Sequence, residues 1–201
     1  MTDSAPASTR IYGGVTAERR LEQRRQRLVD AGLELFGTRG VAAVGIVDIC
    51  AEAGLTKRYF YESFASIDEL ASAVFKHVTD RLVEQVVPAI VAGGGQDPRP
   101  ALTAYFNGAL ADPRIVRLLA VEGRTGTLAH YGDGFATRAV ELWFSFTPRV
   151  EGKDDAALRL RAYAFAGAIT QVGLALHDSA LNLTVERVID ELVDIFNALV
   201  P

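Results

Sequence analysis

Two cations and two phenols stand close together near residue 60, a combination suited to contacts with nucleic acid. Lys57, Arg58, Tyr59 and Tyr61 lie within five consecutive positions. Lys and Arg donate hydrogen bonds to base edges in the major groove and to phosphate oxygens, and tyrosine hydroxyls bind phosphate. A short helix with these side chains at its start suits a major groove and its phosphate walls. We therefore expect this segment to contact double-stranded DNA.

The residues before this cluster predict a tight turn between two short helices. The run IVDICAEA, residues 46–53, is amphipathic, and Gly54 after it can adopt the left-handed conformation that ends a helix. Thr56 is suited to begin the next helix, residues 57–63, because its hydroxyl can accept hydrogen bonds from free backbone N–H groups. The spacing predicts a helix-turn-helix.

Apolar residues in the same segment indicate which side of the second helix is buried. Leu55 and Phe60 have the spacing of a hydrophobic staple, which would fix the angle between the two helices. Phe60 and Phe64 lie four residues apart and should both face inward. The cations and phenols are then left to point elsewhere.

The flanking sequence predicts a helix on each side of this motif. Residues 16–38 read as one long helix that ends at Arg39-Gly40. Ser66 and Glu69 form an S-x-x-E capping box that opens a fourth helix.

One long helix, a tight helix-turn-helix and a newly capped helix resemble the N-terminal pattern of the TetR family of bacterial transcriptional regulators. LELFGTRG, IVDICAEAGLTKRYFYESF and SIDEL carry the resemblance, which covers about residues 20–75. It implies an all-α fold of about nine helices. It also implies a helix-turn-helix DNA-binding domain at 16–65 and a ligand-binding and dimerisation domain at 66–201. The small, polar residues of the N-terminus predict a disordered arm at residues 1–15.

Three residues depart from the family's usual pattern. Gly45 stands where the family usually has Thr or Ser as the cap of the second helix, and Asp48 can partly compensate through the helix dipole. Arg58 replaces a small residue and can add a base or phosphate contact. Ile67 replaces a lysine, which removes one phosphate contact. The DNA-binding residues that we expect are Arg24, Gly45, Thr56, Lys57, Arg58, Tyr59 and Tyr61.

The net charge of −4 fits this interpretation only when the chain is divided. Residues 1–64 carry 9 Lys and Arg against 8 Asp and Glu, whereas residues 65–201 carry 12 against 17. Six arginines between Arg10 and Arg27 are placed to reach phosphate, although such a run is also what a solvated helix face looks like. The chain has one cysteine, and it has neither an apolar run long enough to span a bilayer nor the apolar core of a signal peptide. These features predict a cytoplasmic protein without a membrane role.

The rest of the chain reads as further helices without a strand pattern. Apolar residues recur with a helical period from Leu70 to Val86, and Pro88 should kink or end that helix. A loop is expected over residues 92–100. The later helices are expected over residues 101–111, 113–122, 135–146, 154–177 and 185–198.

The last two of these helices are the expected homodimer surface. One holds small residues that permit close approach of helices, and the other has too many apolar residues for one narrow buried stripe. The alternative is that both complete the core of a single domain. The interface residues that we expect are Ala164, Gly167, Ala168, Gly173, Val188, Leu192, Ile195 and Phe196. A two-fold dimer carries two recognition helices and so predicts a palindromic operator.

The middle of the chain combines aromatic and polar side chains, as a small-molecule site requires. Core packing is the competing explanation for each of them. The ligand-binding residues that we expect are Tyr105, Phe106, His130, Tyr131, Trp143, Phe144, Tyr163 and Gln171. The resemblance implies that a small apolar effector moves the fourth helix and releases the operator.

No pattern of an enzyme, cofactor site or metal site is present. The three histidines are isolated, Cys50 is suited to a small buried position, and the glycines at 93–95 lack the lysine of a phosphate-binding loop. We therefore expect a ligand-responsive regulator, most simply a repressor. The alternative is a helical small-molecule binding protein that no longer uses DNA.

Overall fold

The computed structural model describes residues 17–94, 97–124, 128, 136–141, 144 and 155–199. Within these residues the chain is helical and contains no strand, which confirms the predicted all-α class. The α-helices with defined bounds are α1 (Ala17–Arg39), α2 (Ile46–Ala53), α3 (Lys57–Ser63), α4 (Ile67–Ala92), α5 (Arg99–Leu110), α6 (Pro113–Arg117), α8 (Asp155–His177) and α9 (Val185–Leu199). A 3-10 turn forms at Val41–Ala43, and a π-helical segment at Leu118–Glu122 continues α6.

Most predicted helix bounds hold to within one or two residues. The bounds of α2 and α3 are those predicted from the sequence. Of the helix expected over residues 135–146, residues 136–141 and 144 are helical, and the others lie outside the described residues. The expectation that Pro88 could end α4 is wrong, because α4 continues to Ala92. Pro88 lacks an N–H to donate to the carbonyl four residues earlier, yet the helix continues for four residues beyond it.

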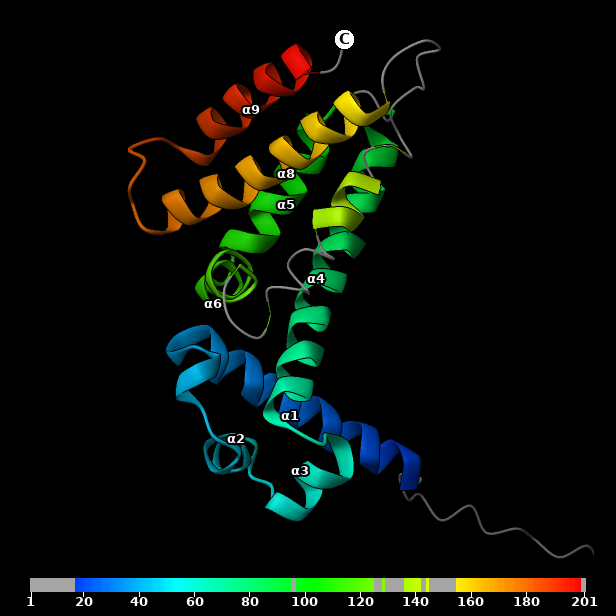
Figure 1. Ribbon diagram of the computed structural model, residues 1–201, viewed down its shortest axis with the longest axis vertical. Helices are drawn as coiled ribbons and strands as arrows, with labels where there is room; N and C mark the ends of the chain where they lie inside the picture. The colour runs from blue at the N-terminus through cyan, green and yellow to red at the C-terminus, as the bar shows by residue number, and fades with distance from the viewer. Residues whose placement is uncertain are drawn as a thin grey trace, which may run out of the picture.

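The helices form a small head and a larger body joined by α4 (Figure 1). Helices α1, α2 and α3 make up the head at one end of the molecule. Helix α4 runs from the head into the body, where α5, α8 and α9 lie together, and α6 lies between α1 and these body helices (Figure 1). Helix α3 is therefore at the end of the molecule farthest from α9.

One apolar core extends from the head along α4 to α6. It contains side chains from every helix of the head and from α4, all at most 3% exposed: Leu28, Leu35, Phe36, Ile49, Phe60, Phe64, Leu70, Val74, Phe75, Val78 and Leu82. Leu118 and Leu119 of the π-helical segment belong to the same cluster. The domain boundary at residues 65–66 stays a prediction, and the buried core is continuous across it.

A second apolar cluster holds the body together. It consists of Leu102, Phe106, Phe165, Val188, Ile189, Leu192 and Phe196 from α5, α8 and α9. The rings of Phe165 and Phe196 meet edge to face, with centroids 5.5 Å apart.

Helix α6 is fixed to α1 by a close backbone approach and an ion pair. A Cβ atom at Gly37 of α1 would lie 2.4 Å from Cβ of Arg114 in α6, so only glycine fits there. Nη1 of Arg114 donates to Oε2 of Glu34 at 2.5 Å, and the same guanidinium donates to the carboxylate of Asp112, the N-cap of α6. The hydrogen bonds from Arg114 lower the pKa of Asp112 below its usual value.

The capping residues behave differently at three helix starts. The hydroxyl of Ser66 accepts from the backbone N–H of Glu69 at 3.1 Å, as the capping box predicts, and the Glu69 carboxylate accepts from the backbone N–H of Ala65. Thr184 caps α9 in the same way, through the N–H of Arg187. Thr56 occupies the N-cap position of α3 with extended backbone angles, yet its hydroxyl makes no capping hydrogen bond. The predicted capping role of the Thr56 side chain is therefore wrong.

This difference predicts unequal effects of removing the two hydroxyls in the head. Ser66→Ala should lower the free energy of unfolding by about 1 kcal/mol, because an N-terminal N–H of α4 loses its partner. Thr56→Ala should change it by less than about 0.5 kcal/mol, the usual range for a surface site. Urea unfolding followed by circular dichroism measures both. Equal losses in the two variants would contradict the observed capping pattern.

Candidate nucleic-acid interface

The turn between α2 and α3 depends on one glycine and one arginine. Gly54 adopts φ 61° and ψ 39°, the left-handed conformation predicted for it, and the N–H of Leu55 donates to the carbonyl of Cys50 at 2.9 Å. Arg27 of α1 donates from Nη2 to the carbonyls of Ala53 and Gly54. A guanidinium at the C-terminus of α2 satisfies free carbonyls and complements the helix dipole.

A second arginine of α1 holds the end of α3. Nη1 of Arg25 donates to the carbonyl of Ser63 at 2.8 Å, and its guanidinium lies 4.2 Å from the centre of the Phe64 ring. Phe60 and Phe64 are both buried, as predicted, with ring centroids 6.1 Å apart. These contacts fix the rotation of α3 about its own axis.

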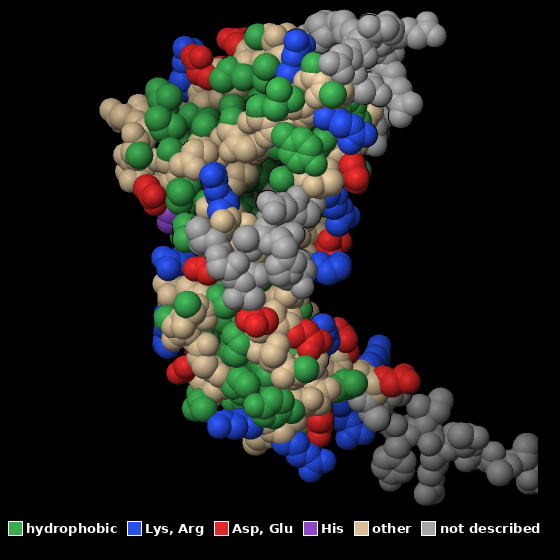
Figure 2. Space-filling model, viewed as in Figure 1, with side chains coloured by type: hydrophobic (Ala, Val, Ile, Leu, Met, Phe, Trp, Pro, Cys, Tyr) green, Lys and Arg blue, Asp and Glu red, His purple; other side chains and the backbone are tan. Residues whose placement is uncertain are grey.

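The outer side of α3 presents most of the predicted DNA-binding side chains. Lys57 and Arg58 are exposed, with 84% of the Arg58 side chain accessible, and Tyr61 is 58% exposed. Thr56 is exposed as well. Figure 2 shows Lys and Arg side chains along the rim of the head, with several acidic side chains among them.

Tyr59 lies differently, because Arg24 of α1 covers it. The guanidinium carbon of Arg24 is 4.0 Å from the centre of the Tyr59 ring, a cation–π geometry, and Tyr59 is half-buried. Arg24 and Tyr59 thus meet in space, 35 residues apart in the chain, although their sequence positions give no sign of this contact.

Glu62 is a site residue that the sequence analysis missed. Its Oε1 accepts from Nε of Arg58 at 2.9 Å, and its Oε2 accepts from Nη1 of Arg24 at 3.3 Å. One carboxylate on α3 therefore joins two of the cations expected to contact DNA. The four-residue spacing of Arg58 and Glu62 was a signal for the first contact, whereas nothing local indicated the second.

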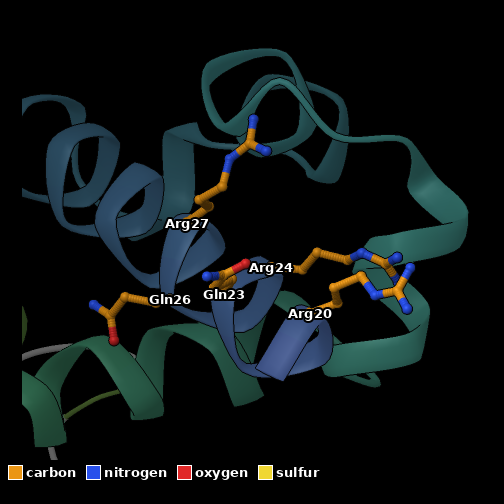
Figure 3. A pocket seen from close by; sticks show the side chains of 5 residues that line it. All are labelled: Arg20, Gln23, Arg24, Gln26 and Arg27. Carbon is orange, nitrogen blue, oxygen red and sulfur yellow. The ribbon is translucent and has the colours of Figure 1, made fainter. Parts of the chain in front are cut away.

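Two arginines of α1 contact the backbone of the helix-turn-helix, and one of them also lines a hollow. Arg25 and Arg27 are engaged with backbone carbonyls of the helix-turn-helix, which assigns them a structural contribution that the sequence analysis did not foresee. Arg20, Gln23, Arg24, Gln26 and Arg27 line an open hollow of about 440 Å³ on α1. Arg20 and Arg24 point the same way from the helix, and Arg27 points away from them (Figure 3). Three arginines and two glutamines of α1 thus line the hollow.

Gly45 lies exposed at the N-cap of α2, as expected. Its backbone N–H donates to Oδ2 of Asp48 at 2.9 Å. Asp48 therefore compensates for the missing cap side chain through a hydrogen bond as well as through the helix dipole. Among the described residues, chain neighbours aside, only the Asp48 carboxylate would come within 4 Å of a Cβ at Gly45.

The residues expected to bind a ligand fall into three groups. Phe106 is fully buried and Tyr105 is largely buried, both on α5, whereas Tyr163 and Gln171 on α8 are exposed. The hydroxyls of Tyr163 and Thr137 are 3.1 Å apart, Gln171 accepts from Arg124, and Phe144 lies under the guanidinium of Arg159. His130, Tyr131 and Trp143 lie outside the described residues. The ligand site stays a prediction.

The residues expected at the dimer interface also divide. Val188, Leu192 and Phe196 are buried in the apolar cluster of their own chain. Gly173 is also buried, and a Cβ atom at this position would lie 3.9 Å from the ring of Phe106. Ala164 and Gly167 are exposed on α8, Ala168 is half-exposed, and Ile195 on α9 is 46% exposed. The exposed members are the ones available to a second copy of the chain.

Two absences concern the described residues alone. No group of three or more His, Cys, Asp and Glu among them is placed to hold a metal ion. None of the described helices has the length and apolar character needed to cross a membrane.

Cys50 is buried on α2, and this burial raises the pKa of its thiol, as expected of a small core residue.

Comparisons with known proteins agree with this geometry. The sequence model of a family described as bacterial regulatory proteins, tetR family, matches residues 28–74, which run from the middle of α1 into α4. The chain is 26% identical over 141 residues to the HTH-type transcriptional regulator BetI of Brucella anthropi, an alignment that covers 70% of this chain and 61% of BetI. It is 34% identical over 100 residues to the HTH-type transcriptional activator FasR of Mycolicibacterium smegmatis, covering 49% of this chain and 46% of FasR.

A solved structure shares the fold over nearly the whole chain. NalD, the secondary repressor of the MexAB-OprM multidrug efflux pump in Pseudomonas aeruginosa, superimposes with a TM-score of 0.65 at 20% identity. The superposition covers 89% of this chain and 96% of NalD. The chain thus matches NalD along its length in fold, whereas its alignments with BetI and FasR span less than two thirds of those proteins.

The buried phenol of Tyr105 makes a prediction about alkaline pH. Burial raises the pKa of Tyr105 from its ordinary 10.0 to about 12, opposed by a hydrogen bond to the Thr170 side chain. The unfolded chain therefore loses this proton first as the pH rises. The stabilisation from the neutral phenol is complete below pH 10 and is lost as the pH rises toward 12.

Urea unfolding of the wild type and of Tyr105→Phe over this pH range measures the effect. The free energy of unfolding of the wild type should fall relative to that of Tyr105→Phe as the pH passes 10. A difference between the two proteins that is constant with pH would mean that Tyr105 is accessible to water.

Proposed function

The chain belongs to the TetR family of bacterial regulatory proteins, and from this membership we propose that it is a ligand-responsive transcriptional regulator. The resemblance seen in the sequence is thereby confirmed. In this proposal a homodimer binds a palindromic operator through two copies of α3. A small apolar effector bound in the body weakens that binding, so that the protein acts as a repressor.

The outer side of α3 carries the proposal. Lys57, Arg58 and Tyr61 reach solvent together at one end of the molecule, while Phe60 and Phe64 hold the helix from within. A helix that merely completed the head would have no need of two exposed cations and an exposed phenol on one side. We assign Lys57 and Arg58 to base edges and phosphates in the major groove and Tyr61 to a phosphate.

The helices of the body supply the surface for a second copy. Leu160 and Tyr163 on α8 are 71% and 42% exposed, and they lie on the same helix as the exposed Ala164 and Gly167. An apolar surface with small residues permits close packing of α8 and α9 from two chains. A two-fold axis through such an interface presents two α3 helices to one duplex and requires an inverted repeat.

Two connections can carry a change from the body to the head. Helix α4 contributes to the core of the head and extends into the body, and α6 is held to α1 by Arg114, Glu34 and the close approach at Gly37. An effector that shifts α4 or α6 therefore displaces α3 relative to its twin. By linkage, effector and operator must weaken each other's binding by the same factor.

Repression is the direction of regulation that we propose. NalD is a repressor and FasR an activator, so both outcomes occur among similar proteins. We favour repression because release by an effector requires only that the dimer leave its operator. The competing function is a helical ligand-binding protein without a DNA partner, for which an exposed Lys57, Arg58 and Tyr61 would have no use.

Selection of bound fragments from genomic DNA tests the function directly. The wild-type protein should enrich fragments that share an inverted repeat. Fragments without a shared sequence would favour the competing function.

Removing two cations from α3 should weaken operator binding strongly and leave the fold intact. Lys57→Ala with Arg58→Ala should weaken binding to the selected operator by about 100-fold, because each base contact contributes about 1–3 kcal/mol. Both side chains are exposed, so the free energy of unfolding should change by less than about 0.5 kcal/mol per site. Fluorescence anisotropy measures the affinity, and light scattering checks that the dimer persists.

A matched variant separates base recognition from net charge. Lys76→Ala with Arg81→Ala likewise removes one lysine and one arginine, here from exposed positions on α4. It should lower operator affinity by far less than the α3 pair does. Equal losses in the two double variants would show that α3 does not read the bases.

A further inference from the structure

One carboxylate stands between two of the cations expected to contact DNA. Glu62 accepts from Nε of Arg58 through Oε1 and from Nη1 of Arg24 through Oε2, at 2.9 and 3.3 Å. We call this arrangement of Arg24, Glu62 and Arg58 the Glu62 bridge. It joins α1 to α3 across the outer surface of the head.

The energetics of the bridge argue against a role in stability. The Arg58 side chain is 84% exposed, and those of Glu62 and Arg24 are 35% and 30% exposed. Ion pairs at the protein surface typically change the folding equilibrium by about fivefold or less. An arginine that precedes its glutamate by four residues is also in the less favourable order for a helix. The bridge therefore does little for the fold.

Its geometry has a clearer consequence for the Arg58 side chain. The bond from Nε to Glu62 restricts a long side chain that would otherwise sample many rotamers, and it leaves both Nη groups of Arg58 outside that bond. A pair of such donors matches the O6 and N7 atoms of guanine in the major groove. Holding the guanidinium in advance lowers the entropy lost when this contact forms.

We propose that Glu62 is a positioning residue that sets operator specificity by holding Arg58 for a guanine. The inference rests on the proposed DNA-binding function and adds a base class and a residue to it. Glu62 itself makes no base contact in this assignment. Its carboxylate also repels phosphate, so it weakens binding to any duplex and leaves the guanine contact to restore affinity at the operator alone.

The test compares two affinities in four proteins. Wild type, Glu62→Gln, Arg58→Ala and the double variant are each titrated with the selected operator and with a scrambled duplex of the same length. The ratio of the two dissociation constants is the specificity. Glu62→Gln should bind the scrambled duplex more tightly, with a steeper salt dependence, and its specificity should fall by about fivefold or more.

The double variant shows whether Glu62 acts through Arg58. In the Arg58→Ala background, Glu62→Gln should leave the specificity unchanged within about twofold, because the side chain to be positioned is absent. An equal loss of specificity in both backgrounds would overturn the proposal and assign a direct base contact to Glu62. Unchanged specificity of Glu62→Gln in the wild-type background would overturn it as well.

A control variant isolates the change in charge. Glu52→Gln removes one carboxylate from an exposed position on α2. It should change the affinities for both duplexes by a similar factor and keep their ratio. A specificity loss as large as that of Glu62→Gln would show that net charge alone accounts for the effect, which would overturn the positioning role.

A measurement without DNA keeps this inference distinct from the proposed function. In nitrogen-15 NMR spectra of the free protein, the Nε–H of Arg58 should exchange slowly with water, and Glu62→Gln should accelerate that exchange while the melting temperature stays the same. Unaltered exchange would overturn the proposal and leave DNA binding untouched. Failure of the wild type to distinguish operator from scrambled duplex would overturn the proposed function and this inference together.

Discussion

The burial of Phe60 and Phe64 is the constraint on which the rest of the head depends. Both rings are at most 1% exposed, and they fix which side of a seven-residue helix faces the core. A helix this short has little stability of its own, so its position comes from tertiary packing. Arg25 and Arg27 add to this packing by donating to carbonyls at the ends of α3 and α2. Because Phe60 and Phe64 are held in the core, the cations on the other side of α3 face solvent.

The same core explains how the head and body can act on each other. Leu70, Val74 and Phe75 of α4 are buried with residues of α1, and Leu82 of α4 belongs to the same cluster. A Cβ atom at Gly32 would lie 2.7 Å from the Val74 side chain. The backbone of α1 is therefore packed closely against a side chain of α4. Close-packed interfaces move between discrete arrangements more readily than they deform. A shift of α4 in the body therefore has to be accommodated in the head.

Local sequence patterns predicted the helices, but they did not predict the contacts between residues far apart in the chain. The bounds of α2 and α3 followed from Gly54 and the amphipathic period on either side, and the start of α4 followed from Ser66 and Glu69. The bond from Arg24 to Glu62 joins residues 38 positions apart, and the bond from Arg27 to Ala53 joins residues 26 apart. No spacing rule reaches that far. The same limit applies to the residues expected at a dimer interface. The sequence marked α8 and α9 as apolar but did not tell which side of each helix is buried within its own chain, as Val188 and Leu192 are.

The balance of charge in the head bears on how such a protein would find its site. Two of the arginines of α1 are engaged with backbone carbonyls, and Glu62 offsets part of the charge of Arg24 and Arg58. General attraction to DNA scales with the number of cations that neutralise phosphates. A head that is nearly neutral, in a chain of net charge −4, therefore gains little affinity from an arbitrary sequence. Its affinity has to come from contacts that only the right base sequence completes, which favours discrimination over tight binding to DNA in general.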